Sequence, residues 1–187
     1  MNPWVWVVLA ILVVLAIAVV VSYNRFVRQR NLVEESWRQV DVELNRRHDL
    51  VPNLVETVKG YAAHERGTFE AVTAARAAAS APGSGPAEQA VQENVLQQAL
   101  RQLFAVAEAY PDLKASEGFR DLQRQLAETE DRIAASRRFY NANVRAYNTR
   151  IESFPSSLVA KTFTFTRAEY FLADDPEVRA NPTVSFS

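Results

Sequence analysis

Residues 4–21 read WVWVVLAILVVLAIAVVV, a run of 18 apolar side chains, and no charged side chain occurs before Arg25. The hydrocarbon core of a bilayer is about 30 Å thick and an α-helix rises about 1.5 Å per residue, so this run and the two residues after it can cross a membrane. A cleaved signal peptide is the alternative, but it would begin with basic residues and have a shorter apolar core. The Met-Asn-Pro start carries no Lys or Arg. The pattern therefore predicts an uncleaved transmembrane anchor over residues 1–23.

The residues that flank this run predict its orientation. Trp4, Trp6 and Tyr23 stand where interfacial aromatic side chains are expected. Arg25 and Arg28 follow the run, whereas no cationic side chain precedes it. The positive-inside rule then predicts a single-pass protein of the cytoplasmic membrane, with the rest of the chain in the cytoplasm. Together with Arg30, these arginines would add a weak attraction to anionic membrane lipid, or the three could merely end the apolar segment without changing this topology.

The composition excludes several classes of function. The 164 residues after the anchor are enough for one domain with its own core. A net charge of -1 argues against a nucleic-acid partner, and the absence of cysteine excludes disulfides and thiolate zinc sites. His48 and His64 are the only histidines, and a separation of 16 residues does not match the His-Glu-x-x-His spacing of a zinc protease. We therefore expect no metal, no cofactor and no enzymatic activity.

Beyond the anchor, apolar side chains recur at alternating intervals of three and four residues, which is the pattern of packed helices. The first stretch continues to Ala79, and residues 80–86, SAPGSGP, end it. Pro52 cannot donate a hydrogen bond to the carbonyl of His48, so we expect the helix to bend or restart there. The apolar positions of this stretch are Val33, Trp37, Val40, Leu44, Val51, Leu54, Val58 and Tyr61.

Two more helices follow. The first is predicted over residues 87–109, with Glu88 favourably placed near its positive N-terminal end. Tyr110-Pro111-Asp112 ends it, and Ser116 can cap a last helix that continues to Phe154. The connections between the helices are short, which favours antiparallel neighbours.

The predicted fold is all-α, an N-terminal transmembrane helix followed by an antiparallel up-and-down helical bundle over residues 24–154. It has three long helical segments, and a bend of the first at Pro52 gives four helices. In the alternative arrangement, the early turns of the first segment form a stalk above a three-helix bundle. The tail over residues 155–187 is less regular, and its aromatic side chains are expected to pack on the bundle. These are Phe163, Phe165, Tyr170 and Phe171.

Several short motifs lie along the chain in order. They are Leu50-Val51-Pro52-Asn53-Leu54-Val55, Tyr61-Ala62-Ala63-His64-Glu65, Tyr110-Pro111-Asp112-Leu113-Lys114-Ala115, Tyr140-Asn141, Tyr147-Asn148, Phe154-Pro155 and Leu158-Val159-Ala160. Together they resemble the LemA family of bacterial proteins. The resemblance implies a helical bundle on a single membrane anchor, with no agreed biochemical function. Some relatives are tied to building membrane organelles, and others are encoded beside membrane proteases. One departure is Thr164, where the family pattern leads us to expect Gly, so the backbone turn there is a point to examine.

Polar residues on the apolar faces are candidates for structural or interaction roles. Glu130 and Arg137 lie seven positions apart on the core side of the last helix, and Arg47 and Glu65 interrupt the first apolar pattern. If such groups meet inside the bundle, they would fix helix register at a large desolvation cost; otherwise their charged ends reach the bundle edge. His64 and Glu65 together are expected to make a polar contact that locks one helix to its neighbour.

The Tyr140-Asn141 pair recurs two helical turns later as Tyr147-Asn148, so both tyrosines share one face and both asparagines share the adjacent one. One interpretation is a set of core tyrosines and cross-helix asparagines. The other is a docking strip for a partner helix. A buried Tyr147 would favour the core.

Three classes of function follow from these features. The first is a membrane-anchored scaffold or adaptor that recruits or organises protein partners at the cytoplasmic membrane face, including membrane proteins or further copies of itself. The second is a membrane-tethered sensor or ligand-binding bundle, for which a polar internal cavity would be decisive. An enzyme is the third, and the sequence offers no titratable cluster for it.

Overall fold

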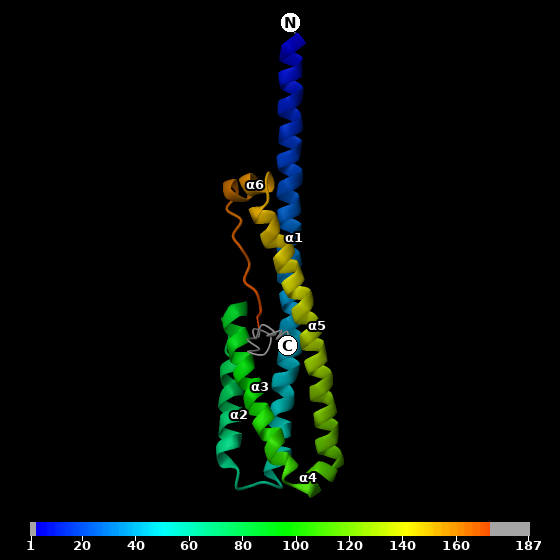
Figure 1. Ribbon diagram of the computed structural model, residues 1–187, viewed down its shortest axis with the longest axis vertical. Coiled ribbons are helices and arrows are strands. Elements are labelled where there is room, and N and C mark those ends of the chain that lie inside the picture. The colour runs from blue at the N-terminus through cyan, green and yellow to red at the C-terminus, as the bar shows by residue number, and fades with distance from the viewer. Residues whose placement is uncertain (1–2, 173–187) are drawn as a thin grey trace, which may run out of the picture. The chain divides into compact units, whose positions relative to one another are not determined.

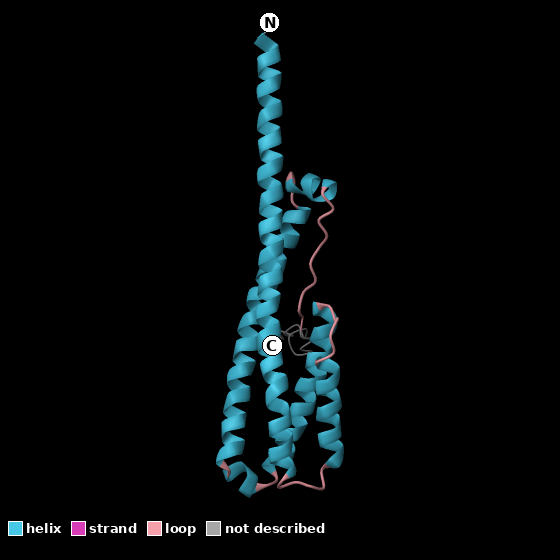
Figure 2. Cartoon of the chain, turned by 180° about the vertical axis from the view of Figure 1, so that it is seen from behind, coloured by secondary structure: helices cyan, strands magenta, loops and turns pink. Residues whose placement is uncertain are grey.

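The computed structural model describes residues 3–172 of the chain. Within that range it is all-helical and contains no strand (Figure 1; Figure 2), which confirms the predicted fold class. The helices are α1 (Pro3–Lys59), α2 (Arg66–Ala79), α3 (Pro86–Glu108), α4 (Pro111–Ala115), α5 (Glu117–Glu152) and α6 (Ser156–Thr162). They form two compact units. The first unit contains residues 3–41 and 135–170, and the second contains residues 42–134 with 171 and 172.

The second unit has the core of a four-helix arrangement. The last turns of α1, helices α2 and α3, and the first turns of α5 all contribute apolar side chains to it, and α4 connects α3 to α5. These side chains recur every three or four residues, so each helix buries one face. The buried core includes Val51, Leu54, Val58, Phe69, Val72, Leu96, Leu100, Leu103, Leu113, Phe119 and Leu126.

The expected interruption at Pro52 does not occur. Helix α1 runs through Pro52 to Lys59, and the chain instead leaves the helix at residues 60–65. The first stretch therefore supplies two helices, but they are separated later than predicted. Packing explains the continuity, because Val51 and Leu54 on either side of the proline are buried. Pro52 has no N–H to donate to the carbonyl of His48. This carbonyl instead accepts a hydrogen bond from Arg76 Nε at 2.7 Å.

The first unit packs the early part of α1 against the end of α5 and the segment after α6. Phe26, which is fully buried, lies at its centre; its ring is 4.8 Å from that of Phe165 and 6.3 Å from that of Tyr147, centroid to centroid. In both ribbon views, the chain turns at α6 and then runs back beside α5 (Figure 1; Figure 2). Phe154, expected on the buried face, is 81% exposed at this corner, because the helix has already ended at Glu152.

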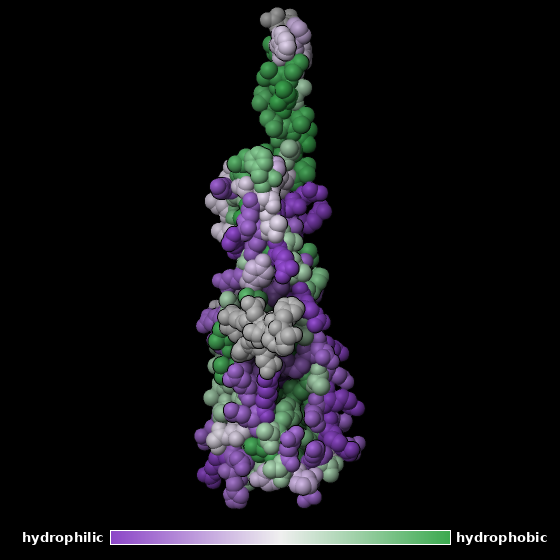
Figure 3. Space-filling view, in the orientation of Figure 1, coloured by the Kyte–Doolittle hydropathy of each residue, from purple (hydrophilic) through white to green (hydrophobic). Residues whose placement is uncertain are grey.

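Helix α1 begins with the apolar run seen in the sequence. An 18-residue window in it has a mean hydropathy of 3.2 and none of it is buried, and within the described residues it is the only helix long and apolar enough to cross a membrane. The space-filling view shows this part as continuously hydrophobic (Figure 3). Trp4 and Trp6 are exposed, while the Tyr23 ring lies 4.9 Å from that of Phe163.

Helix α6 ends in a turn that explains the departure at Thr164. The N–H of Phe165 donates to the carbonyl of Ala160 at 2.9 Å, and the N–H of Thr164 donates to that of Lys161 at 3.4 Å. These are the two hydrogen bonds of a Schellman motif, which requires a left-handed residue at its C′ position and usually has Gly there. Thr164 holds this position with φ of 55°. The turn is thus formed in spite of the missing glycine.

Candidate functional site: a buried charge cluster and an aromatic clasp

The polar centre of the second unit is Arg47 on α1. Its side chain is only 3% exposed and forms ion pairs with Glu93 on α3 and Glu130 on α5. The bond from Arg47 Nη1 to Glu130 Oε1 measures 2.6 Å, and Arg47 Nη2 donates to Glu93 Oε2. One guanidinium therefore joins three helices, because its planar fork can serve two carboxylates at once.

Glu93 receives two further hydrogen bonds. Its Oε1 atom lies 2.8 Å from His48 Nε2 on α1 and accepts a bond of 2.8 Å from Gln89 Nε2 one turn earlier on α3. Gln89 Nε2 also donates to the carbonyl of Ala79 at the end of α2, at 2.7 Å. Since an ionised carboxylate can only accept, His48 Nε2 carries the hydrogen in this contact. The cluster thus reaches the ends or faces of four helices.

The electrostatics of the cluster keep both central groups charged. Burial alone would raise the pKa of Glu93, but the hydrogen bond from His48 and the positive charge of Arg47 outweigh it and hold the pKa below the usual value. Burial would likewise lower the pKa of Arg47, and the charges of Glu93 and Glu130 raise it instead. A buried pair of this kind is costly to desolvate and very costly to break. Its physical effect is to fix which helices are neighbours and in what register.

Two of the four polar residues singled out in the sequence meet in this cluster, because Arg47 pairs with Glu130. Arg137 belongs to the first unit and is partly exposed. Glu93 and Gln89 were not predicted to be buried. Their positions do indicate burial, because residues 89, 93, 96 and 100 are separated by four, three and four residues, as the apolar side chains of packed helices are. Extending the apolar pattern of α3 backwards would have identified both as buried.

His64 and Glu65 lie in the connection between α1 and α2. The His64 side chain is exposed, and in the described part of the chain it makes no hydrogen bond or ion pair. The predicted lock between neighbouring helices is therefore not formed by His64. Glu65 acts through its backbone, because its carbonyl accepts the N–H groups of Thr68 and Phe69 at the start of α2. This pair marks a helix boundary.

The first unit contains the second polar arrangement, an aromatic clasp formed by Tyr140, Tyr147 and Asn148 on α5. The Tyr140 hydroxyl donates to the carbonyl of Glu169 at 2.7 Å. Asn148 makes two bonds of 2.9 Å with Ala168, donating from Nδ2 to its carbonyl and accepting its N–H at Oδ1. Residues 168 and 169 belong to a non-helical segment that has no strand partner, and the clasp provides hydrogen-bond partners for their backbone groups.

Burial decides between the two interpretations of this strip. Tyr140 and Tyr147 are 2% and 3% exposed, so they are core residues, and the alternative of a docking strip made by these tyrosines is wrong. Burial, together with the negative charge of Glu169, raises the pKa of Tyr140 to about 12. Asn141 is partly buried on the neighbouring face and also makes contacts. Tyr140 and Asn148 thus bind the backbone of the chain's own segment after α6.

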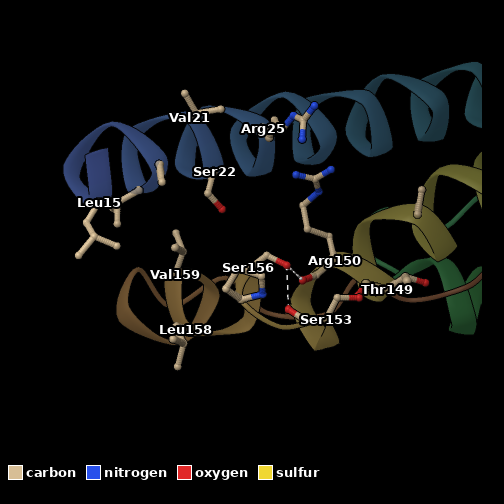
Figure 4. Close-up of a pocket in the computed structure, with 14 residues that line it drawn as sticks. Leu15, Val21, Ser22, Arg25, Thr149, Arg150, Ser153, Ser156, Leu158 and Val159 are labelled. Atoms are coloured by element: carbon tan, nitrogen blue, oxygen red, sulfur yellow. Dashed lines mark hydrogen bonds between the residues drawn. The ribbon is translucent and has the colours of Figure 1, made fainter. Parts of the chain in front are cut away.

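A groove lies beside the apolar run in the first unit. It is lined by α1 from Leu15 to Arg25, by the last turns of α5 and by α6, and has a cavity volume of about 720 Å³ (Figure 4). Arg25 and Arg28 are both exposed, but only Arg25 lines the groove. No local sequence pattern indicates this groove, because it arises only when α6 folds back beside α1.

The matches to known proteins agree with this architecture. Residues 36–186 match the LemA family model. The chain belongs to the LemA family. The matched range includes Arg47, Glu93, Glu130 and all three residues of the clasp, so the resemblance seen in the short motifs is confirmed.

Individual relatives of this LemA-family chain come from three species. The magnetosome proteins MamQ 1 and MamQ 2 of Paramagnetospirillum magneticum are each 29% identical over 174 residues, covering 80% of this chain and 64% of their own length. Magnetosome protein MamQ of Magnetospirillum gryphiswaldense is 27% identical over 185 residues. Protein LemA of Metamycoplasma hominis is 26% identical over 157 residues, or 82% of this chain and 70% of its own. The chain thus spans just under two thirds of the length of the first two relatives.

The contacts observed at these sites are structural. Within residues 3–172, no group of three or more His, Asp or Glu side chains is placed to hold a metal ion. The buried carboxylate and imidazole of the second unit are already engaged with each other, and the tyrosines of the first unit are engaged with the tail. Both arrangements hold helices and segments in place.

Proposed function

We propose that this LemA-family chain is a membrane-anchored helical scaffold that presents its second unit to protein partners at the cytoplasmic face of the membrane. The observation that supports this most directly is helix α1. Its apolar run is exposed, and the same helix continues to Lys59 and supplies Arg47 and Leu54 to the second unit. An anchor that shares a helix with the bundle tethers that bundle without a flexible linker.

The internal contacts also favour a scaffold over a catalyst. A catalytic site needs titratable groups that remain available to a substrate. Here, the strongest cluster of charges pairs its carboxylates with its own Arg47 and His48, and it joins α1, α3 and α5; Arg47 Nε and His48 Nδ1 are the cluster atoms left without a partner. Such a cluster specifies one arrangement of helices, as a protein that displays a fixed surface requires.

Partner binding can be tested by photo-crosslinking in living cells from one position on each face of the second unit. Gln97 lies in a groove of about 260 Å³ between α3 and α5, and Glu70 is an exposed position on α2. A scaffold gives one dominant protein adduct from one of these positions and not from the other. Equal, diffuse labelling from both positions, unchanged when residues 1–23 are removed, would contradict the proposal.

The orientation needs its own test. The chain has no cysteine, so a single Ser84→Cys substitution in the loop before α3 can be labelled without background. A membrane-impermeant thiol reagent should label it only after the cells are permeabilised. Labelling of intact cells would place the second unit outside the cytoplasm and overturn this part of the proposal.

A further inference from the structure

The groove beside the apolar run has two chemically different ends. At one end, Leu15 of α1 and Val159 of α6 provide apolar walls, and at the other end Arg25 and Arg150 come together from α1 and α5 (Figure 4). Among the lining residues described, these arginines are the charged ones and no carboxylate is present. A cavity with an aliphatic end and a cationic end is complementary to an anionic amphiphile.

The arginines are free to bind such a ligand. In the described part of the chain neither forms a salt bridge, and Arg150 Nε is buried without a hydrogen-bond partner. Arg150 is held in place because its guanidinium lies over the Phe26 ring, 5.9 Å from the centroid. The nearby carboxylate of Glu152 is paired with Arg167. The Arg150 guanidinium lines the groove and has no carboxylate partner in the described part of the chain, so a phosphate can pair with it.

Two of the hydroxyl groups that line the groove, those of Ser153 and Ser156, cannot replace the arginines as donors. Ser153 Oγ donates to the carbonyl of Thr149 at 2.7 Å, and Ser156 Oγ donates at 2.8 Å to the carbonyls of Arg150 and Ser153 (Figure 4). Their hydrogens are therefore already used by the backbone of the α5–α6 corner. The hydroxyls of Ser22 and Thr149 also line the groove, but the guanidinium groups are its charged donors, and their positive charge selects an anion over a neutral polar group.

The position of the groove along α1 identifies the source of the ligand. Its apolar end includes residues of the proposed membrane span, and its cationic end begins directly after that span. Exposed apolar side chains continue on the same corner, with Phe154 81%, Leu158 58% and Phe163 44% exposed. Leu158 lies on α6, and Phe154 and Phe163 flank this short helix; exposed apolar side chains on and beside a short helix next to a span favour a position in the headgroup region.

We propose that this groove is a binding site for an anionic phospholipid of the bilayer, with an acyl chain against Leu15 and Val159 and the phosphate between Arg25 and Arg150. The inference rests on the proposed membrane anchoring. The α5–α6 corner thereby becomes a second membrane contact, specific for lipid charge, in addition to the span itself.

The test is native mass spectrometry of the full chain released from nanodiscs that contain equal amounts of phosphatidylglycerol and phosphatidylcholine. The unmodified chain should retain phosphatidylglycerol in preference to phosphatidylcholine. Replacing both groove arginines, Arg25→Gln with Arg150→Gln, should lower that preference about tenfold. The matched control, Arg46→Gln with Arg138→Gln, removes the same charge from exposed positions of α1 and α5 outside the groove and should keep the preference.

A second pair of variants tests the groove without changing its charge. Ala146→Phe fills the lining, whereas Ala142→Phe places the same ring one turn earlier on an exposed position outside it. Only Ala146→Phe should lose the retained lipid. Equal retention of both lipids by the unmodified chain, or equal losses in a groove pair and its control, would overturn the proposal.

Flotation of the same samples on a density gradient separates this inference from the anchor. A chain that floats with membranes but shows no preference for phosphatidylglycerol refutes the lipid site alone. A chain that does not float refutes the membrane anchor, and the lipid site with it. Adducts to another protein from a photo-crosslinker at Val159, in place of lipid, would assign the groove to a partner helix and also overturn the proposal.

Discussion

Thr164 shows how much a single backbone angle can matter in this chain. It occupies the left-handed C′ position after α6 with φ of 55°, where a β-branched residue is strained. Thr164→Gly removes a strain of about 1–2 kcal/mol and adds back some freedom to the unfolded chain, so we expect a net gain of about 0.5–1 kcal/mol in the free energy of unfolding. Chemical unfolding of the full chain in detergent measures this. Thr162→Gly, in the last turn of α6, should destabilise instead, and equal effects of the two changes would contradict the explanation.

Glu93 is the residue on which the buried cluster depends. Glu93→Gln leaves Arg47 with one carboxylate in place of two, and we expect a loss of about 3 kcal/mol or more in the free energy of unfolding. The control is Glu88→Gln in the exposed first turn of the same helix, for which the loss should stay below about 1 kcal/mol. Comparable losses in the two variants would show that the cluster contributes little.

The same residue predicts a pH dependence. The folded state lowers the pKa of Glu93, so its contribution is present above the unfolded pKa of about 4.3 and is lost as the pH falls through the lower folded value. Unfolding measured from neutral pH downwards should therefore show a loss of stability in that acid range that is smaller in Glu93→Gln. An identical acid dependence in the two proteins would contradict the assignment of a depressed pKa.

At the level of elements, the continuity of α1 through Pro52 depends on another helix. Arg76 on α2 donates to the carbonyl of His48, which in a regular helix would receive the N–H of residue 52. Arg76→Met should cost about 1–3 kcal/mol, because it leaves a carbonyl without a donor. In a Pro52→Ala background the alanine N–H can donate to the same carbonyl, and the destabilisation caused by Arg76→Met should fall by about 1 kcal/mol. A double-mutant cycle of unfolding free energies measures this coupling, and additive effects would show that Arg76 does not compensate for the proline.

The elements also separate what can be read from the sequence from what cannot. The helix over 87–109 and the cap at Ser116 were predicted almost as observed, since α3 is Pro86–Glu108 and Phe119 N–H donates to Ser116 Oγ at 3.3 Å. The end of α1 was misplaced, because the donor that carries the helix past Pro52 comes from a residue 28 positions away from His48. Local rules cannot include such a partner.

For the whole chain, the exposed apolar run predicts stable insertion into a membrane. Leu12→Arg with Val13→Arg puts two charges at the centre of the run, at a cost of about 2.5–3.5 kcal/mol each. We expect the variant to move from the membrane fraction to the soluble fraction in sedimentation assays. The control, Leu12→Ala with Val13→Ala, should remain in the membrane fraction. If the arginine variant stays there as well, the run is not the element that anchors the chain.

The sequence by itself determined the features that depend on local composition: the apolar run, the helical periodicity, the helix ends at glycine, proline and capping residues, and the family motifs. These follow from the spacing of side chains along one helix and from backbone chemistry; the exception among the helix ends is that of α1 at Lys59, which was not predicted. The tertiary structure decided which polar residues meet. Arg47 pairs with Glu93 and Glu130 across 46 and 83 positions of sequence, and α6 creates the groove only by folding back beside α1. Such pairings are set by the packing of helices that are distant in the chain, and no local pattern specifies them.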